Sequence, residues 1–283
     1  MRIIVTGSAG FIGKHTVNAL LEKGYAVVGY DIANGFDLLD YKQLCSVIRR
    51  GDKVIHEAAI ARFADADANP LLTYRVNVQG TENVARACAK QGAERLIYAS
   101  TGSVYIPIEK EPPITEDFPV RGNSVYACSK CTAEKVVQEY NTPWVILRYG
   151  HLYGEGKIGH GAIGGFIAKM KQGLQPIIYG GKQSNDFCLV DDIVQANLLA
   201  LETENTNEAY NIGTGEELTT IRVFEIMREF FKYDKEFDIR DARIVDPLRF
   251  VYDITKARKL LGYNPQYNFE SGLKKWLGGE KLS

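Results

Sequence analysis

Short apolar runs alternate with helical patterns over the first half of the chain. Each apolar run has the length of a β-strand, and the segments between the runs have the periodicity of helices that bury one face. The predicted strands cover residues 2–6, 26–30, 53–58, 95–100 and 144–149, and the predicted helices cover residues 11–23, 40–50, about 70–90 and 125–140. Continuous apolar strands that alternate with helices are typical of a parallel sheet covered on both faces. The pattern therefore predicts a doubly wound α/β fold.

The pattern changes after residue 150. The segment GHLYGEGKIGHGAIGGF (150–166) is rich in glycine, which indicates loops around a ligand. The later elements are predicted to be mostly helical, at residues 163–172, 190–202, 219–231, 254–261 and 269–277. We expect one domain formed by residues 1–150 with about 183–213. A smaller, mostly helical lobe is expected from about 151–182 and 214–283.

Composition narrows the possible functions. The 34 Lys and Arg residues nearly balance the 35 Asp and Glu residues, for a net charge of −1, so nothing favours binding to nucleic acid or to a membrane surface. No apolar stretch has the length of a membrane span, and residues 1–7 show no signal-peptide pattern. The five cysteines are scattered, and Cys128 and Cys131 lie in a predicted helix without a second pair, so no metal site is predicted. Reduced thiols fit a cytoplasmic protein.

Three glycines stand at three-residue intervals between the first strand and the first helix. In VTGSAGFIG (5–13), a direct strand-to-helix turn brings the first helical N–H groups together, where the helix dipole adds positive charge. Gly7 permits the turn, Gly10 permits close approach of a ligand, and Gly13 lets the helix pack on the strand. The simpler alternative is a surface turn. The strand before and the helix after favour a pyrophosphate site and a Rossmann-type sheet.

An acid ends the second strand. The Asp31 carboxylate would accept hydrogen bonds from the hydroxyls of an adenosine ribose and repel a 2′-phosphate, so NAD is predicted over NADP. Only a few residues separate Asp31 from DLLD (37–40), where a full helix and strand would normally fit. We therefore expect a shortened crossover and an abbreviated sheet on the adenine side.

Tyr126 and Lys130 are four residues apart in a predicted helix and should share one face. An ammonium group near a phenol lowers its pKa, so the tyrosine could exchange protons with an alcohol near neutral pH. Thr101, at the end of a strand, could bind the same substrate oxygen. Two further Y-x-x-x-K matches are placed less suitably, in the glycine-rich segment and late in the chain: Tyr153/Lys157 and Tyr252/Lys256.

These motifs, with HEAA (56–59), VNVQGTENV (76–84), STGSVY (100–105), LRYGHLYGEG (147–156) and YNIGTGE (210–216), resemble the extended short-chain dehydrogenase/reductases of the nucleotide-sugar epimerase/dehydratase group. The resemblance covers almost the whole chain. It implies that Tyr126 is the catalytic base, that Lys130 binds the nicotinamide ribose, and that Thr101 is the hydroxyl partner. It also implies cofactor-binding positions at Gly7, Gly10, Phe11, Ile12, Gly13, Asp31, Asp37, Leu38, Ala58, Ala59, Ile60 and Asn77, together with Tyr126 and Lys130.

The reaction that the family implies is hydride removal from a sugar carbon, usually C4, onto NAD. Dehydratases of the family usually carry an acidic pair after the hydroxyl residue, whereas Thr101 is followed by Gly102 and Ser103. Without these carboxylates an elimination lacks its acid and base. The most suitable reading is a 4-epimerase of a UDP-hexose. An NADH- or NADPH-dependent reductase of a keto nucleotide sugar and a non-catalytic NAD-binding scaffold are the alternatives.

Two departures from the family pattern concern the substrate. His151 replaces a common asparagine that contacts the diphosphate end of the substrate, and it is either a substrate ligand or a neutral packing residue. Asn185 stands where an arginine commonly precedes Asp-Phe, and it offers no bidentate cationic contact. Arg243 or Arg249 could compensate, and Tyr179 could stack on a nucleobase. Each of these three could equally be an ordinary surface or core residue.

Two further expectations concern helices and a histidine. The two long helices commonly pair with those of a second copy in this family, which implies a homodimer. His56 ends a buried strand, where a structural hydrogen bond is expected rather than catalysis.

Overall fold

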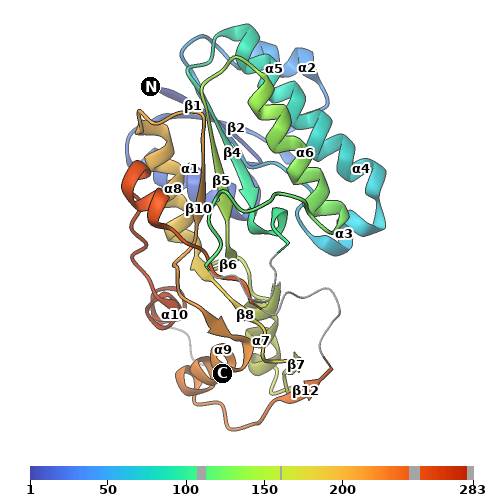
Figure 1. Ribbon diagram of the computed structural model, residues 1–283, viewed down its shortest axis with the longest axis vertical. Helices are drawn as coiled ribbons and strands as arrows, with labels where there is room; N and C mark the ends of the chain where they lie inside the picture. The colour runs from blue at the N-terminus through green and yellow to red at the C-terminus, as the bar shows by residue number, and fades with distance from the viewer. Residues whose placement is uncertain (107–112, 160, 242–248, 279–283) are drawn as a thin grey trace.

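The computed structural model describes residues 1–106, 113–159, 161–241 and 249–278. Its centre is a sheet of six parallel strands in the order β10-β5-β4-β3-β1-β2 (Figure 1). The strands are β1 (Arg2–Thr6), β2 (Ala26–Tyr30), β3 (Lys53–His56), β4 (Arg95–Thr101), β5 (Trp144–Tyr149) and β10 (Glu208–Ile212). The predicted parallel sheet is confirmed, with β10 added at one edge.

Helices cover both faces of this sheet (Figure 1). One face carries α1 (Phe11–Glu22) and α8 (Val190–Glu202), and the other carries α2 (Tyr41–Val47), α5 (Gly80–Gln91) and α6 (Val125–Glu139). Alternate strand residues supply the two cores, because successive side chains of a strand point to opposite faces. Ile3 and Val5 pack in the core that contains α8 residues, whereas Ile4 packs with residues of α2, α5 and α6.

The sheet ends at β2. After β2 the chain makes a short 3₁₀ turn (Ile32–Asn34) and enters α2 directly, and β3 then pairs with the other side of β1. In the described part of the chain no strand lies beyond β2. The expected shortened crossover and the abbreviated edge are therefore confirmed.

The predicted helix at about 70–90 contains a π-helical turn. The chain runs through α3 (Phe63–Ala68) and α4 (Pro70–Tyr74) into a π turn (Arg75–Gln79), and then into α5. A π turn inserts one extra residue per turn and is frequent at functional sites. The hydrophobic pattern did not reveal this turn, because the residues on either side keep a helical period.

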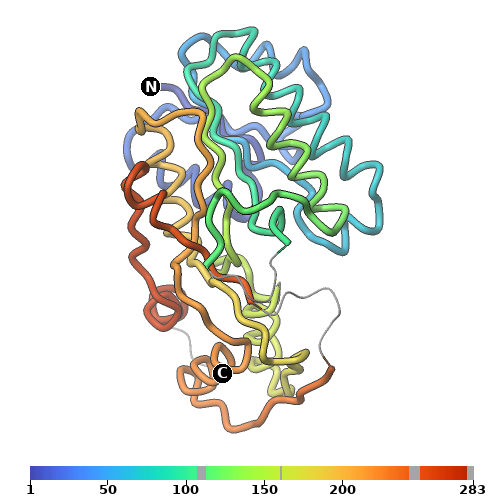
Figure 2. Tube along the Cα trace, viewed as in Figure 1, coloured from blue at the N-terminus to red at the C-terminus, as the bar shows by residue number. Residues whose placement is uncertain are grey.

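The remaining chain forms a smaller part with its own apolar core of Tyr, Phe, Ile and Met side chains. Its helices are α7 (Gly161–Lys171), α9 (Thr220–Phe231) and α10 (Phe269–Leu277), and its strands are β6 (His151–Tyr153), β7 (Ile177–Tyr179), β8 (Ser184–Asn185), β9 (Phe187–Leu189), β11 (Leu218–Thr219) and β12 (Asp238–Arg240). The strands pair as β6-β9, β7-β12 and β8-β11, and these short pairs were not predicted. Figure 2 shows the chain leaving the sheet after β5, returning to it at α8 and leaving again after β10.

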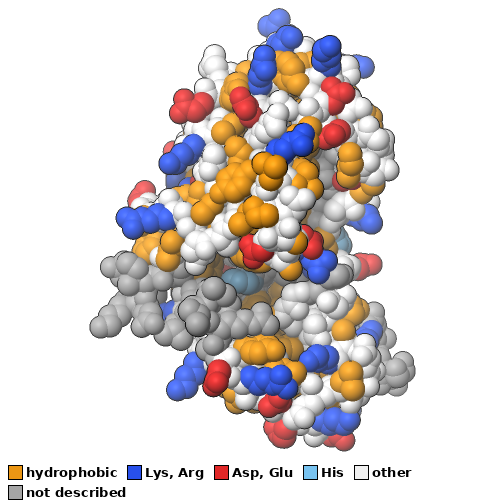
Figure 3. Space-filling model, turned by 90° about the vertical axis from the view of Figure 1, so that its right-hand side faces the viewer, with side chains coloured by type: hydrophobic (Ala, Val, Ile, Leu, Met, Phe, Trp, Pro, Cys, Tyr) orange, Lys and Arg blue, Asp and Glu red, His pale blue; other side chains and the backbone are white. Residues whose placement is uncertain are grey.

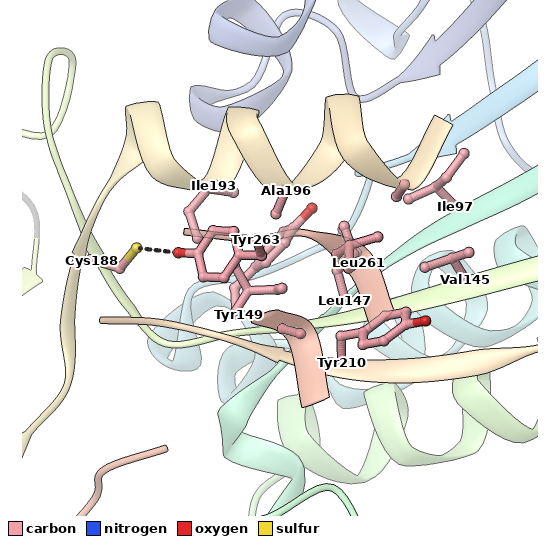
Figure 4. Packing of buried hydrophobic residues seen from close by; sticks show 14 of the residues in the cluster. Ile97, Val145, Leu147, Tyr149, Cys188, Ile193, Ala196, Tyr210, Leu261 and Tyr263 are labelled. Carbon is pink, nitrogen blue, oxygen red and sulfur yellow. Dashed lines mark hydrogen bonds between the residues drawn. The ribbon is translucent and has the colours of Figure 1, made fainter. Parts of the chain in front are cut away.

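The C-terminal segment returns to the sheet before it forms α10. Tyr263 is fully buried, and its hydroxyl donates to the Gly213 carbonyl over 3.0 Å. Figure 4 shows its ring beside Ile193 and Ala196 of α8. Residues far from the sheet in sequence thus help to close its core, while the domain limits given above stay a prediction. No helix in the described ranges is long and apolar enough to cross a membrane.

Candidate active site

The glycine-rich loop is packed so closely that side chains are excluded from it. Gly7 has a φ of +71°, and a Cβ there would lie 2.6 Å from the Ala58 backbone nitrogen. A Cβ on Gly13 would lie 2.1 Å from the Gly7 carbonyl oxygen. Helix α1 begins after Gly10 with no side-chain cap and no acid in its first turn. Its first N–H groups are therefore available to an anion, and the loop fits the pyrophosphate of a dinucleotide.

Asp31 is fixed beside this loop. One of its carboxylate oxygens accepts a hydrogen bond from the Ala9 amide over 3.0 Å, and the other accepts from the Ala33 amide over 2.9 Å. Each carboxylate oxygen keeps a lone pair for a ribose hydroxyl. Asp37 lies nearby, where its carbonyl accepts a hydrogen bond from the Tyr30 hydroxyl over 2.7 Å, and Leu38 is buried next to it.

Asn77 holds the loop that follows β3. It lies in the π turn, and its Oδ1 accepts from the Ile60 amide over 2.8 Å. Its Nδ2 donates to the Ile60 carbonyl and to the Ser129 hydroxyl, both over 3.0 Å. The buried Asn77 side chain thus ties the loop of Ala58, Ala59 and Ile60 to the helix that carries Lys130. Asn77 therefore holds this loop in place beside the site.

Tyr126, Thr101 and Lys130 meet where β4 ends and α6 begins. Tyr126 is buried, lies close to the Thr101 side chain, and packs edge-on against Phe63 with ring centroids 5.3 Å apart. The Lys130 Nζ donates to the Ala99 carbonyl over 2.7 Å and lies 4.6 Å from the centroid of the Tyr98 ring. Ser124 caps α6 by accepting a hydrogen bond from the Ala127 amide, which fixes the start of this helix.

The pKa values of Tyr126 and Lys130 differ from the expectation drawn from the sequence. Burial raises the pKa of Tyr126 to about 12, against a smaller lowering by the nearby Thr101 side chain. Burial lowers the pKa of Lys130 to about 7, although Glu134 and Glu57 favour its charged form. The expected lowering of the phenol pKa by Lys130 is not seen, because the ammonium is directed at Ala99 and both groups are desolvated.

Two buried acids near Lys130 were missed by the sequence analysis. Glu134, one turn further along α6, forms an ion pair with Arg148 over 2.8 Å and also accepts from the Ser100 hydroxyl. This pair braces the end of β4, where Thr101 lies. The position of Glu134, four residues after Lys130, was the available signal.

Glu57 lies beneath the glycine loop. Its Oε1 accepts from the Thr16 hydroxyl over 2.8 Å and from Asn197 Nδ2 over 2.7 Å, whereas its Oε2 is buried without a hydrogen-bond partner. Burial raises the pKa of Glu57 to about 8. The acid within HEAA (56–59) was the signal for this residue.

A cavity of about 450 Å³ lies in the smaller part, and the surface is hollowed between the two parts of the molecule (Figure 3). The residues that line the cavity include His151, Lys169, Tyr179, Gln183, Asn185 and Phe187. His151 lies between the rings of Phe187 and Phe250, with centroids 5.9 and 5.6 Å away. His151 is exposed, and partial desolvation among these rings lowers its pKa from the ordinary value, which favours the neutral side chain at pH 7.

The structure does not bring every predicted substrate residue to this cavity. Arg249 forms an ion pair with Glu217 over 2.6 Å and is not part of the cavity lining. Arg243 lies outside the described residues. His56 is a structural residue as expected, since its two ring nitrogens contact the hydroxyls of Thr6 and Thr81 over 2.6 and 2.9 Å. Burial lowers its pKa to about 3.

The sheet, the glycine loop and the Tyr126–Lys130 helix define a dinucleotide-dependent enzyme of the Rossmann class. The model of the NAD dependent epimerase/dehydratase family matches residues 3–213, and the chain belongs to this family. A UDP-glucose 4-epimerase of Bacillus subtilis is 30% identical, over 95% of this chain and 94% of that protein.

Solved structures of the same family are also similar to this chain. The UDP-glucose 4-epimerase of Thermotoga maritima, solved with UDP-glucose, superposes with a TM-score of 0.92 at 31% identity, covering 98% of each chain. The Thermus thermophilus UDP-glucose 4-epimerase, solved with NAD, superposes with a TM-score of 0.87 at 31% identity, again over 98% of each chain. The cofactor is NAD, as the glycine loop and Asp31 predicted.

Proposed function

We propose that this chain is an NAD-dependent epimerase that acts at C4 of a UDP-hexose through a transient 4-keto sugar. The observation that carries the proposal is the position of Tyr126 and Thr101. Their side chains lie close to each other at the carboxyl end of the sheet, where ligands of open α/β sheets bind. The similarity to UDP-glucose 4-epimerases over nearly the full chain supports the same reaction.

The residues of the chain would divide the work as follows. Tyr126 would take the proton from the sugar hydroxyl and return it once a bound positive charge lowers its pKa from about 12, and Thr101 would hold that oxygen. Lys130, fixed by Ala99, would bind the nicotinamide ribose. When bound, NAD supplies the acceptor and donor of the hydride. The protein contributes position and proton transfer.

The position after Thr101 supports epimerisation over dehydration. Gly102 has no room for a side chain, because a Cβ there would lie 2.1 Å from the Tyr252 hydroxyl and 2.4 Å from Phe250 Cζ. Ser103 donates its amide to Thr101 Oγ1 and brings no carboxylate. An acid pair for elimination therefore has no place in this turn.

The nucleotide end of the substrate is assigned to the cavity in the smaller part. Tyr179 and the neutral His151 line it, and Phe166 and Phe187 supply apolar walls suited to a base or ribose. Since His151 carries no charge at pH 7, it would act as a hydrogen-bonding or packing group toward the substrate. Asn185 also lines the cavity and offers an uncharged amide to the ligand.

The reaction is tested by incubating the purified protein with UDP-galactose, without added NADH, and measuring UDP-glucose. The matched variant Tyr126→Phe removes one hydroxyl and should lower kcat by about 10³-fold, the usual scale of acid–base catalysis. Equal activity in this variant would contradict the proposal. Failure to interconvert any C4 pair of nucleotide sugars would also contradict it. Stoichiometric loss of NADH absorbance with a keto sugar would identify a reductase instead.

We also propose a homodimer. Large apolar side chains are exposed on α4 and beside it, with Leu71 74% exposed and Leu72 40% exposed. Figure 3 looks onto the side of the molecule that carries α4 to α6 and shows hydrophobic side chains gathered there. Light scattering during size-exclusion chromatography should give twice the 31.6 kDa of one chain, and a mass of one chain would exclude the dimer.

A further inference from the structure

A loop from the smaller part lies against the first turn of α1. The loop runs from Gly154 to Lys157, directly after β6, and is called here the 154–157 loop. The Glu155 carbonyl lies 3.0 Å from Nε2 of His15, and the His15 ring packs edge-on against Phe11 with centroids 5.6 Å apart. Two chain segments about 140 residues apart are thereby joined beside the glycine loop.

The loop is shaped to approach this helix closely. Gly156 has a φ of +91°, a conformation that favours glycine, and a Cβ there would lie 3.6 Å from the Phe11 ring. Lys157 then extends over the same ring, with its Nζ 4.7 Å from the ring centroid. Phe11 is the first residue of α1, so the ammonium is held next to the uncapped end of that helix.

Two positive side chains, Lys157 and Arg62, lie near each other here, and Arg62 also forms an ion pair with Asp65 over 3.6 Å. Lys157 is half-buried, and within the described residues no carboxylate forms an ion pair with it. Arg62, from the loop after β3, is close enough for its charge to lower the pKa of Lys157 further than burial alone does. The α1 N-terminus adds its own partial positive charge. The Lys157 ammonium beside this positive helix end therefore favours an anion bound next to both.

We propose that Lys157 is a cofactor-binding residue, and that the 154–157 loop closes over the glycine loop so that the Lys157 ammonium binds the pyrophosphate of NAD. Arg62, which acts electrostatically on Lys157, precedes Phe63, whose ring packs on Tyr126. The contact ties cofactor binding to a loop that also begins the smaller part. It rests on the NAD site and is independent of which sugar the enzyme converts.

The experiment compares ligands that differ in their phosphates. Affinities of apo-protein for NAD⁺, ADP-ribose, adenosine and UDP are measured by calorimetry for the wild type and for Lys157→Gln. One charge-assisted contact corresponds to a loss of roughly ten-fold for NAD⁺ and for ADP-ribose. No change is expected for adenosine, which lacks the pyrophosphate, or for UDP.

Two further variants sharpen the result. Lys157→Arg keeps the charge and should restore most of the affinity, whereas Lys23→Gln removes an exposed lysine at the far end of α1 and should change nothing. Unchanged NAD⁺ affinity in Lys157→Gln would overturn the proposal. Weaker binding of UDP with intact binding of NAD⁺ would also overturn it, because the ammonium would then serve the diphosphate of the substrate.

Discussion

The two ends of the active site are built in different ways. On the cofactor side, the backbone makes the site: a strand, three glycines and the start of a helix follow each other within twelve residues, Arg2–Gly13. On the substrate side, side chains make it, from β6, α7, β7 and the segment around β8 and β9. A site made by consecutive backbone can be predicted from spacing. A site assembled from side chains of distant segments depends on the tertiary fold, which spacing does not specify.

Exchanging one glycine for alanine on each side is the strongest test of this difference. In Gly13→Ala the new methyl group would lie 2.1 Å from the Gly7 carbonyl oxygen, so the glycine loop must move. Overpacking of this kind costs about 3 kcal/mol, and we expect NAD⁺ affinity to fall by at least about 100-fold. In Gly165→Ala, within α7, no atom lies within 4 Å of the new methyl group, and the fold should gain about 0.5–1 kcal/mol.

The measurements are NAD⁺ titration and urea unfolding of both variants. Because Gly165 lines the cavity, its alanine variant is expected to alter the affinity for UDP and to leave the affinity for NAD⁺ unchanged. Wild-type NAD⁺ affinity in Gly13→Ala would show that the loop yields without loss. A loss of NAD⁺ affinity in Gly165→Ala would show that the cavity and the glycine loop are not separable.

The same contrast decides what the sequence could predict. The parallel sheet, the glycine loop, Asp31 and the shortened crossover follow from local pattern, because each depends on neighbours in the chain. The short strand pairs such as β7-β12 do not, since each strand has only three residues and gains its partner from far away. The direction of the Lys130 ammonium and the high pKa of Tyr126 were also missed. Helical spacing places two residues on one face but does not specify their partners or their burial.

Buried polar groups connect the elements beneath the glycine loop. Beneath the glycine loop, Glu57 accepts from Thr16 of α1 and Asn197 of α8, and Asn197 in turn accepts from the Tyr149 hydroxyl over 2.7 Å. This network links both helices of one sheet face to the end of β3. The smaller part holds a buried acid as well, Asp186, which accepts hydrogen bonds from Thr214 and Gly215. Because Glu57 is held in the network beneath the glycine loop, its titration should change the free energy of unfolding with pH.

The last effect we predict is in the pH dependence of folding. The pKa of Glu57 is raised from 4.5 to about 8, so between these values the folded state keeps a proton that the unfolded state releases. Its stabilising contribution is complete below pH 4.5 and is lost as the pH rises toward 8, with a slope of up to about 1.4 kcal/mol per pH unit. Lys130, whose pKa is lowered to about 7, acts in the opposite direction and only above that pH.

Glu57→Gln keeps the shape of the side chain and removes its titration. Relative to the wild type, the variant should gain on the order of 1–2 kcal/mol between pH 5.5 and pH 7.5, measured by urea unfolding at both values. Glu22→Gln, an exposed change of the same kind at the end of α1, should leave the wild-type slope intact. If Glu57→Gln and the wild type gave parallel stability curves, Glu57 would already be ionised in the folded protein. The unpartnered Oε2 beneath the glycine loop would then need a cation or water to stabilise it, and the cofactor side would be less apolar than its packing indicates.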